Sequence, residues 1–356
     1  MTVDAPVPAP PSPPAQAPAR AQSAAQSIAQ SAAPSAAPSA APSAAPLWLS
    51  AEDITARVGY LAAVRAMQAE LRGTFDPRAD FSRSILDLDH GQLLLMPAES
   101  PRYVGVKVAS VAPGNPARGL ERIQGVYLLL DGDTLGPLVL LDGAMITALR
   151  TPAVSAAAAD LLAPAGIDHL VVFGSGPQAW GHVEALRSIR SIGRVSVVAR
   201  NQERTEAFAA RVRATGLPAR VGSAADVHDA QLVVCATTAR EPLFDGTLVP
   251  DNCCIVAVGS HEADARELDS ALIARAQVVV EDVAVALREG GDVLIPLAEG
   301  VIEKSALVSL KQLLTDATPV ATDRPRVFTS SGMSWEDLVV AALVYETPAP
   351  AIAVST

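Results

Sequence analysis

The sequence predicts an α/β protein with a doubly wound parallel sheet of the Rossmann type and a second, α+β domain. Three observations support this fold class. An apolar run at 170–173 leads into the pattern G-x-G-x-x-A at 174–179, and a helix-forming segment at 180–190 follows. Beyond residue 190, short apolar runs alternate with helical segments. Between 79 and 141, strand-like runs are separated only by short turns, which is typical of an antiparallel or mixed sheet.

The glycine pattern predicts a dinucleotide site because each small residue meets a physical need. Gly174 allows a tight turn off the strand, and Gly176 has no side chain to hold a pyrophosphate away. The small Ala179 lets the helix lie close to the strand, so that free N–H groups at the helix N-terminus point at phosphate. A readable strand before the pattern and a helix after it make it more specific than a bare glycine motif.

Composition limits the classes of function. The chain has 356 residues, enough for two ordinary domains, and its net charge of −11 argues against nucleic acid or an anionic membrane as the main partner. We expect a cytoplasmic protein without a membrane span or secretory signal, because no apolar run is long enough and no basic segment precedes an apolar stretch at the N-terminus. Cys235, Cys253 and Cys254 lie in apolar runs without metal-site spacing, so we interpret them as structural and expect no metal site.

Both ends of the chain are expected to lie outside the folded domains. Residues 1–46 are almost wholly Ala, Pro, Ser and Gln, with a proline at every fourth position of 31–46. Such a segment cannot bury a core and is predicted to be a disordered extension. The folded chain is expected to begin near Leu47, with a helix over 51–72 whose start Ser50 caps. Residues 347–356 are predicted to form a flexible tail.

The expected strands and helices fall into two groups. The first group of strands is expected at 84–88, 91–96, 103–111, 125–131 and 137–142, and a helix over 143–163 leads on to the glycine pattern. Rossmann strands are expected at 194–199, 219–221, 231–236, 253–258 and 277–281, with a helix at 202–215 after the first of them. The final segment, 327–346, begins like a strand and ends as an amphipathic helix, which we expect to return and pack on the first domain.

The end of the second Rossmann strand bears on cofactor preference. An acidic residue there binds the ribose 2′-hydroxyl of NAD, whereas a nearby arginine accommodates the 2′-phosphate of NADP. This chain has Arg200 and Asn201 at that place and no acid until Glu203. The pattern favours NADP(H), and Arg204 could share the phosphate. The alternative is that both arginines are solvated residues at the start of a helix.

Three cations in the first group of elements are candidates for binding an anion. Lys107 lies in the apolar strand 104–108, where it either reaches solvent at an edge or points into a cleft. Arg150 lies in the largely uncharged stretch 144–153 and is either a solvated helix residue or a ligand-binding one. Arg83 precedes the first strand of the group.

His261 follows the strand at 253–258, in the sequence Gly-Ser-His-Glu. Ligands of open α/β sheets bind beyond the carboxyl ends of the strands, so this side chain is placed to face a nicotinamide and a substrate. Histidine exchanges protons near neutral pH. The alternative is a loop histidine that bonds only to backbone.

With these stretches collected, the chain resembles the ornithine cyclodeaminase/mu-crystallin family over essentially all of 47–346. The matching stretches are Met96-Pro97 with YVGVK at 103–107, LDGAMITALRTPAVSA at 141–156, VVFGSGPQAWGHVEAL at 171–186, VAVGSHEADARELD at 256–269, GDVLIPL at 291–297 and SSGMSWEDL at 330–338. Their order and spacing agree with the family, and the combination is far more specific than the glycine pattern alone.

The resemblance implies a homodimer that uses a nicotinamide cofactor on α-imino or α-amino acids. It implies a substrate-binding and dimerisation domain from both chain ends, 47–150 plus 322–346, around a Rossmann domain at 151–321. It also implies that Arg83, Lys107 and Arg150 form a carboxylate clamp, which suits the geometry of arginine and lysine donors. The implied cofactor contacts are Thr151, Gly174, Gly176, Gln178, Ala179, Arg200, Asn201, Thr237, Val258 and Ser331.

Two departures separate this chain from true ornithine cyclodeaminases. Leu94 stands where those enzymes carry a Glu that grips the distal amine of the substrate, and His261 stands where they carry a catalytic Asp. Without the Glu, the ammonium group of ornithine would be desolvated without a partner, which costs several kcal/mol. The mu-crystallin branch, which resembles NADPH-dependent ketimine reductases, also lacks the Asp.

The sequence therefore predicts reduction of a C=N bond beside a carboxylate, in a cyclic ketimine such as Δ1-pyrroline-2-carboxylate or Δ1-piperideine-2-carboxylate. In this hypothesis the clamp residues, Lys107 among them, polarise the substrate and His261 supplies or relays the proton. The alternatives are ornithine cyclodeamination, an alanine-dehydrogenase-type reaction, and a non-catalytic protein that binds NADPH and a small acid. Arg122 and the loop 330–333 are expected to shape the wall of the pocket.

Overall fold

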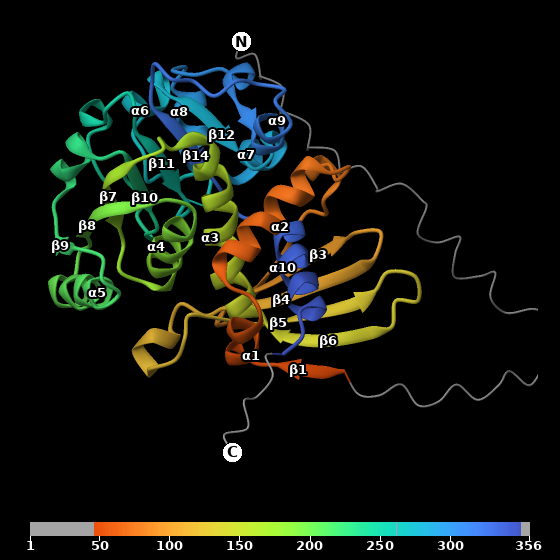
Figure 1. Cartoon of the computed structure of the whole chain (residues 1–356). Coiled ribbons are helices and arrows are strands. Elements are labelled where there is room, and N and C mark those ends of the chain that lie inside the picture. Colours follow the sequence, from red (N-terminus) through yellow and green to blue (C-terminus); the bar gives the residue numbers. More distant parts are fainter. Residues whose placement is uncertain (1–45, 261, 350–356) are drawn as a thin grey trace, which may run out of the picture. The chain divides into compact units, whose positions relative to one another are not determined.

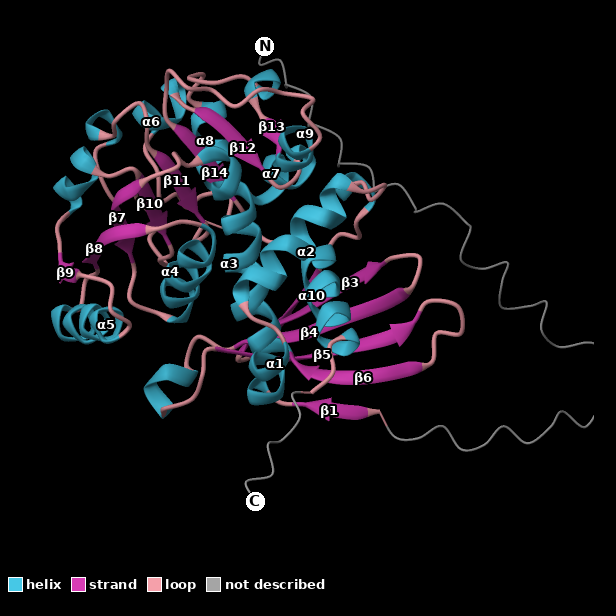
Figure 2. Cartoon of the chain, in the orientation of Figure 1, coloured by secondary structure: helices cyan, strands magenta, loops and turns pink. Residues whose placement is uncertain are grey.

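The computed structural model describes residues 46–260 and 262–349, which form two β-sheets joined by a long buried helix (Figures 1 and 2). The larger sheet has eight strands in the order β13-β12-β14-β11-β10-β7-β8-β9, and the smaller has six in the order β1-β6-β5-β4-β3-β2. The predicted disordered extension, apart from Pro46, lies outside the described residues, as do 350–356 of the predicted tail. Among the described residues, no helix is long and apolar enough to cross a membrane.

All strand pairs of the eight-stranded sheet are parallel, as the alternation of strands and helices predicts. Four central strands are buried on both faces, which explains their unbroken apolar runs. The strands are β7 (Ile167–Phe173), β8 (Ile192–Val198), β9 (Ala219–Val221), β10 (Leu232–Cys235), β11 (Cys254–Ala257), β12 (Gln277–Val280), β13 (Val308–Ser309) and β14 (Arg326–Thr329). The chain runs from β7 outward to β8 and β9 and then returns to β10 on the other side of β7. Ligands bind at such a reversal of strand order.

Helices accompany this sheet between its strands. They are α4 (Pro177–Ile189), α5 (Gln202–Ala214), α6 (Ser270–Arg275), α7 (Val283–Glu289), α8 (Gly291–Ala298) and α9 (Leu310–Leu314). Helix α3 (Gly143–Leu162) precedes them and contacts elements of both sheets, including β5 on one side and β11 and β14 on the other. Its alanine-rich second half is buried, since small side chains let neighbouring backbones approach closely.

The six-stranded sheet is mixed, as the short turns between its strands predict. Strands β2 to β6 are antiparallel, and β1 adds a parallel edge beside β6. The strands are β1 (Leu47–Leu49), β2 (Ser84–Leu88), β3 (Gly91–Glu99), β4 (Tyr103–Val111), β5 (Ile123–Asp131) and β6 (Pro137–Asp142). Helix α10 (Ser334–Glu346) contacts β3, β4 and β5. Lys107 pairs in register with Met96 and Tyr127, and all three side chains are buried on the face that α10 covers.

Two sequence expectations need correction, and several short elements were not expected. The helix expected over 51–72 is interrupted at Val58 and Gly59, so that α1 (Ala51–Arg57) and α2 (Tyr60–Arg72) are separate. The final segment does not lie wholly with the first sheet, because β14 pairs with β11 and β12 inside the parallel sheet and only α10 returns to the six-stranded sheet. A four-residue strand buried on both faces is most stable there. The short strands β1 and β13 and the 3-10 turns were not foreseen.

The cysteines behave as the sequence predicts. All three are free and buried. Burial raises the pKa of the Cys254 thiol to about 12, so this thiol stays protonated and unreactive near neutral pH. No group of three potential metal ligands is found among the described residues.

Candidate functional site

The glycine turn, Gly174–Ala179, lies between β7 and α4 at the carboxyl edge of the parallel sheet. Gly174 has φ +116°, and a Cβ there would lie 2.5 Å from the carbonyl oxygen of Ala236, so only glycine fits without strain. A Cβ on Gly176 would meet no atom within 4 Å. The backbone at Gly176 therefore faces open space at the N-terminus of α4, where helix N–H groups can bind an anion.

Two further features of the glycine turn suit a dinucleotide. Ala179 is fully buried, and its methyl group packs 3.7 Å from the position of a Cβ on Gly174, which brings α4 close to β7. The buried Oε1 of Gln178 has no hydrogen-bond donor within the part of the chain that the structure describes. A ligand in the cradle could satisfy this oxygen, since buried polar atoms are normally hydrogen-bonded.

The end of β8 presents exposed cations. The side chain of Asn201 caps α5 by accepting a hydrogen bond from the Arg204 N–H at 2.9 Å. Arg200 and Arg204 are exposed, and neither side chain forms an ion pair or a hydrogen bond with the described residues. Both guanidinium groups are thus available to a phosphate beside the second strand.

The ends of β10 and β11 are tied together by Glu267, a residue that the sequence analysis did not single out. One carboxylate oxygen of Glu267 accepts from the Thr237 N–H at 2.8 Å and the Thr237 hydroxyl at 2.7 Å, and the other accepts from the Gly259 N–H at 2.7 Å. Asp292 in turn accepts from the Glu267 N–H at 2.8 Å. Burial raises the pKa of Asp292 to about 7. The half-buried Val258 lies just beyond β11, and His261 lies outside the described residues.

Lys107 is buried on β4 and points at the start of α10. Its Nζ lies 2.7 Å from the Asp337 carboxylate and 3.1 Å from the Thr147 hydroxyl of α3. Burial lowers the pKa of Lys107 to about 8, against the attraction of Asp337. Lys107 is therefore neither an edge residue nor a solvated one, but a buried cation near its titration range.

Arg150 is buried in α3 and reaches the same place. Its Nη1 lies 2.7 Å from Oε2 of Glu336, and its Nε lies 3.4 Å from Asp337. Arg150 is thus not a solvated helix residue. A Cβ on Gly332, whose φ is +81°, would lie 2.2 Å from Nη1 of Arg150, so the guanidinium packs directly on this glycine.

Arg83 approaches Gly332 from the other side. Its Nη2 donates to the carbonyl oxygens of Ser331 and Gly332, and its Nε lies 3.3 Å from Glu289. Arg83, Lys107 and Arg150, which we call the cation cluster, therefore meet beside the β14–α10 loop, Ser330–Met333. Among the described residues, Nη1 of Arg83 and Nη2 of Arg150 have no hydrogen-bond partner, so both can donate to a ligand.

The acids that hold the cation cluster were missed in the sequence. Glu336 and Asp337 are fully buried in the first turn of α10, and Glu281, also buried, follows β12. Asp80 caps α10 by accepting from the Ser334 and Trp335 N–H groups at 3.0 and 3.1 Å, and burial raises its pKa to about 6. The available signal was the presence of acids at positions of an otherwise apolar helix.

Leu94 lies on the same face of the six-stranded sheet as Lys107. It pairs with Ala109 on β4, two residues along from the pair Met96–Lys107. Side chains two residues apart on a strand share a face. The wall beside the cation cluster is therefore apolar at this position. Arg122 lies exposed in the chain before β5, and Thr151 is buried next to Arg150 in α3.

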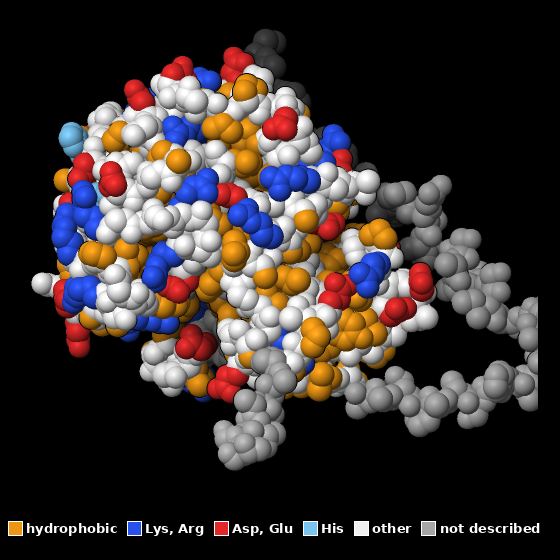
Figure 3. Space-filling model, viewed as in Figure 1, with side chains coloured by type: hydrophobic (Ala, Val, Ile, Leu, Met, Phe, Trp, Pro, Cys, Tyr) orange, Lys and Arg blue, Asp and Glu red, His pale blue; other side chains and the backbone are white. Residues whose placement is uncertain are grey.

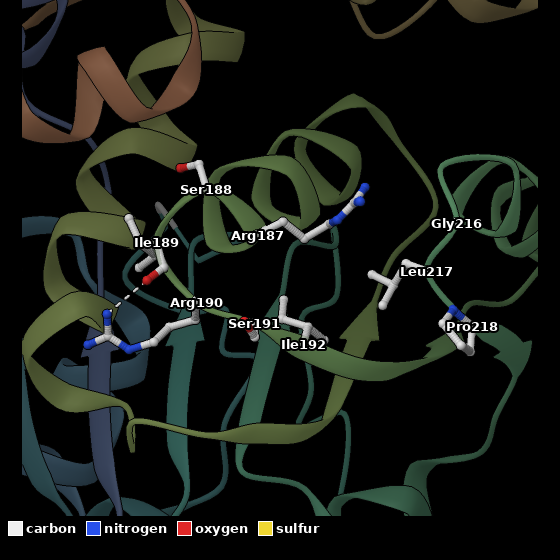
Figure 4. Close-up of a pocket in the computed structure, with 9 residues that line it drawn as sticks. All are labelled: Arg187, Ser188, Ile189, Arg190, Ser191, Ile192, Gly216, Leu217 and Pro218. Carbon is white, nitrogen blue, oxygen red and sulfur yellow. Dashed lines mark hydrogen bonds between the residues drawn. The ribbon is translucent and has the colours of Figure 1, made fainter.

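Of two cavities in the described structure, only the smaller adjoins the site. One of about 100 Å³ adjoins Arg83 and is lined by the segments 77–83 and 332–334 and by α7. A larger one, about 520 Å³, lies between the ends of α4 and α5 and the starts of β8 and β9 (Figure 4). This second cavity is at the opposite edge of the sheet from the glycine turn, and its Arg187 and Arg190 are already bound to Glu184 and Asp160. We do not count it as part of the site.

Comparison with known proteins places these features in context. The mouse ketimine reductase mu-crystallin is 36% identical over 261 residues, which cover 72% of this chain and 80% of that protein. The structure of Thermococcus litoralis Δ1-pyrroline-2-carboxylate reductase with NADH and L-proline has a TM-score of 0.79 and 29% identity, and covers 84% of this chain and 96% of that one. An archaeal alanine dehydrogenase dimer with bound NAD also has a TM-score of 0.79, with 26% identity, over 85% of this chain and 95% of that one.

The family model that matches is that of the ornithine cyclodeaminase/mu-crystallin family, and it spans residues 50–349. This range contains the glycine turn, the whole cation cluster and every strand of both sheets except the edge strand β1. The chain belongs to the ornithine cyclodeaminase/mu-crystallin family.

Proposed function

We propose that this protein uses a reduced nicotinamide dinucleotide to reduce a C=N bond beside a carboxylate. The substrate class is a cyclic ketimine such as Δ1-pyrroline-2-carboxylate or Δ1-piperideine-2-carboxylate, and the product is the L-amino acid. The observation that carries the proposal is the convergence of Arg83, Lys107 and Arg150 at the β14–α10 loop. The names of the mouse and Thermococcus relatives support the same reaction.

The cation cluster would hold the substrate carboxylate. The free Nη1 of Arg83 and Nη2 of Arg150 can each donate to one carboxylate oxygen, and Lys107 adds a positive charge from the sheet. Fixing the carboxylate orients the adjacent imine carbon, and orientation is a large part of catalysis in a two-substrate reaction. Leu94 offers no partner for a distal ammonium, which favours a ring of methylene groups over ornithine.

The cofactor would lie along the carboxyl edge of the parallel sheet. When bound, a reduced nicotinamide supplies the hydride. Gly174, Gly176, Gln178 and Ala179 would receive the pyrophosphate at the N-terminus of α4. The remaining proposed contacts along that edge are Thr151, Arg200, Asn201, Arg204, Thr237, Val258 and Ser331. The exposed, unpaired Arg200 favours NADP(H) over NAD(H).

Lys107 and His261 are the proposed catalytic residues. A lysine with a pKa of about 8 is largely cationic at neutral pH, so Lys107 would stabilise the carboxylate and polarise the C=N bond. His261, two residues beyond Gly259, would supply or relay the proton on nitrogen. An imine that enters already protonated needs positioning more than it needs the acid.

We further propose a homodimer that forms through the uncovered face of the six-stranded sheet. Alternation along the strands directs an apolar set away from α10: Trp48, Leu86, Leu88, Leu93, Leu95, Val106, Val108, Leu128 and Leu140. Leu86 is 48% exposed and Trp48 51% exposed. In Figure 3, which has the view of Figure 1, hydrophobic side chains are visible at the lower right, where the six-stranded sheet lies. A contiguous apolar surface is typical of protein interfaces, and the archaeal relative is a dimer.

The dimer has a direct check. Replacing Val106 by Glu puts a charge in the middle of the apolar face and is expected to convert dimer to monomer in light-scattering measurements of mass. A matched Glu at the exposed Leu135, in the β5–β6 turn, should leave the mass unchanged. A monomeric wild-type protein would reject the proposal.

We place the protein in the cytoplasm, consistent with its three free thiols.

The experiment that tests the function is an assay of NADPH oxidation with a panel of substrates. Cyclic imino acids should be turned over and yield the L-amino acid. Release of ammonia from ornithine with NAD⁺ would instead establish a cyclodeaminase, and turnover of pyruvate with free ammonia an alanine dehydrogenase. NADPH binding without turnover of any imine would make the protein a cofactor-dependent binder of small acids.

A further inference from the structure

Two buried carboxyl groups contact each other directly behind the cation cluster. Glu336 lies in the first turn of α10, which packs on the six-stranded sheet. Glu281 directly follows β12 of the eight-stranded sheet. Oε2 of Glu336 pairs with Arg150 at 2.7 Å, whereas the buried Oε1 has no hydrogen-bond donor among the described residues. Glu281 lies within hydrogen-bonding contact of the Glu336 carboxyl group. Two ionised carboxylates cannot donate to one another, so the contact requires a proton.

The charges around the pair support the same conclusion. Glu289 already pairs with Arg83 and Arg288, and Asp337 pairs with Lys107 and faces Asp80. Arg150 is the cation beside Glu336, and it also faces Asp337 and Glu281. Among the described residues no cation forms an ion pair with Glu281. Without a proton, the two carboxylates of the pair would therefore have a single, shared counter-charge in a site that has to accept a further carboxylate.

We propose that Glu281 and Glu336 share one proton, and that this acid pair is a positioning device that holds Arg150 and the β14–α10 loop in the geometry for binding the substrate carboxylate. The part that concerns binding rests on the proposed function. Neither residue is placed against the reacting atoms. Both act through Arg150 and through the loop.

Glu281 connects the pair to the loop. One of its oxygens accepts from the Ser330 hydroxyl, and the other accepts from the Gly332 N–H at 3.0 Å. Gly332 is the residue on which the Arg150 guanidinium packs, and its carbonyl accepts from Arg83. The acid pair therefore fixes both arginines of the cluster through a single short loop. Burial, and then the neighbouring Glu281, raise the pKa of Glu336 well above its usual range, in agreement with a retained proton.

The test compares a variant that mimics the protonated acid with one that removes it. Glu336→Gln keeps an oxygen for Arg150 and supplies a permanent donor toward Glu281. It should retain the KM for the imino acid within about threefold. Glu336→Leu leaves Arg150 with only the longer contact to Asp337 and leaves Glu281 without its partner acid. It should raise that KM by about tenfold to a hundredfold, with little change in the KM for NADPH. Glu346→Gln, at the exposed far end of the same helix, is the matched control.

The shared-proton proposal and an ordinary ionised Glu336 predict different KM values for the Glu336→Gln variant. If Glu336 were an ordinary ionised partner of Arg150, Glu336→Gln would lose as much affinity as Glu336→Leu, and the proposal would be overturned. Equal KM values in all variants would equally reject it, because the pair would then have no positioning role.

A second readout does not depend on any activity. At neutral pH Asp292 contributes a carbonyl band of a protonated carboxylic acid in every variant. The infrared difference spectrum of wild type minus Glu336→Gln should contain a further band of this kind, and the difference spectrum of wild type minus Glu346→Gln should not. An acid whose pKa is raised in the folded state loses its contribution to stability as pH rises from the unfolded pKa toward the folded one. Thermal unfolding should therefore show Glu336→Gln gaining stability over wild type as pH increases above about 5. No such band and no such trend would reject the shared proton, even if no imine is turned over.

Discussion

The glycine turn and the cation cluster lie at the same carboxyl edge of the parallel sheet but differ in how their polar groups are partnered. At the glycine turn, Gly176 faces open space, and beside it, after β8, Arg200 has no protein partner among the described residues. In the cation cluster, every cation is already paired with a carboxyl group: Lys107 and Arg150 with fully buried ones and Arg83 with the half-buried Glu289. The first arrangement leaves free groups for a cofactor, and the second holds charges in place before any substrate arrives.

The contrast bears on what each region contributes. Unpaired exposed groups at the glycine turn add little to the stability of the fold, and their value lies in binding. The buried charges of the cluster serve both purposes, because an arginine or lysine that loses its carboxylate, or a carboxylate that loses its cation, leaves a buried charge unmatched. Substitutions in the cluster should therefore affect folding and activity together, and those in the turn should separate the two.

The largest effect is expected for Arg150→Ala. It removes a proposed donor to the substrate and leaves Glu336 without its cation, whereas Asp337 keeps Lys107. Loss of one partner of a buried pair costs about 3–5 kcal/mol of stability, and kcat/KM for the imino acid should fall by about 10²–10³-fold. Denaturant unfolding and steady-state kinetics measure the two. An unchanged kcat/KM in a folded variant would remove Arg150 from the site.

The two glycines of the turn offer a matched pair. Gly174→Ala forces a side chain into a positive φ and toward the Ala236 carbonyl, and should destabilise the fold by about 1–3 kcal/mol. The Cβ of Gly176→Ala would meet no atom within 4 Å, so the melting temperature should stay nearly unchanged. The KM for NADPH should rise by about tenfold or more, because the added methyl group obstructs the approach of the pyrophosphate to the helix N-terminus. Melting curves and cofactor titrations decide. The opposite pattern would contradict the assignment of the turn.

Arg200→Ala should have a smaller and more selective effect. The exposed side chain has no structural partner in the described part of the chain, so stability should not change. Loss of one charge-assisted contact to a 2′-phosphate should weaken the binding of NADPH by about tenfold and leave the binding of NADH nearly unchanged. Parallel titrations of the two cofactors provide the measurement. Equal losses for both would show that Arg200 does not read the 2′-phosphate.

The smallest effect is a pH dependence from Asp292. Its pKa of about 7 in the folded protein lies above its unfolded value, so the stability it contributes is present at acidic pH and is lost as pH rises through about 7. Asp292→Asn keeps an oxygen for the Glu267 and Leu268 N–H groups and removes the titration. Unfolding followed from pH 5 to pH 8 should have a flatter slope in the variant. An identical slope would show that Asp292 titrates elsewhere.

The same contrast explains how far the sequence could predict this molecule. The glycine turn is local: its residues lie within one strand–turn–helix unit, and the pattern specifies their geometry. The cation cluster is assembled from the segment before β2, β4 and α3, so its members are far apart in the sequence, and the acids at the start of α10 are farther still. Spacing alone did not decide whether Lys107 and Arg150 face solvent or a ligand. Only the family resemblance placed the two residues in one site.

The acids of the cluster were beyond the reach of sequence patterns for a related reason. Glu281 and Glu336 become neighbours only because β14 inserts between β11 and β12 while α10 crosses to the other sheet. The sequence predicted the strand-like run and the helix of this final segment but assigned both to one domain. The division into domains and the roles of the individual site residues remain predictions.

The most direct test of the clamp compares Δ1-pyrroline-2-carboxylate with Δ1-pyrroline, which has the same imine ring without the carboxylate. If Arg83, Lys107 and Arg150 bind and orient the carboxylate, the measured kcat/KM of the wild-type protein should be higher for the carboxylate by about 10³-fold or more, because the buried donors would face no acceptor in the shorter substrate. Comparable values for the two imines would contradict the account.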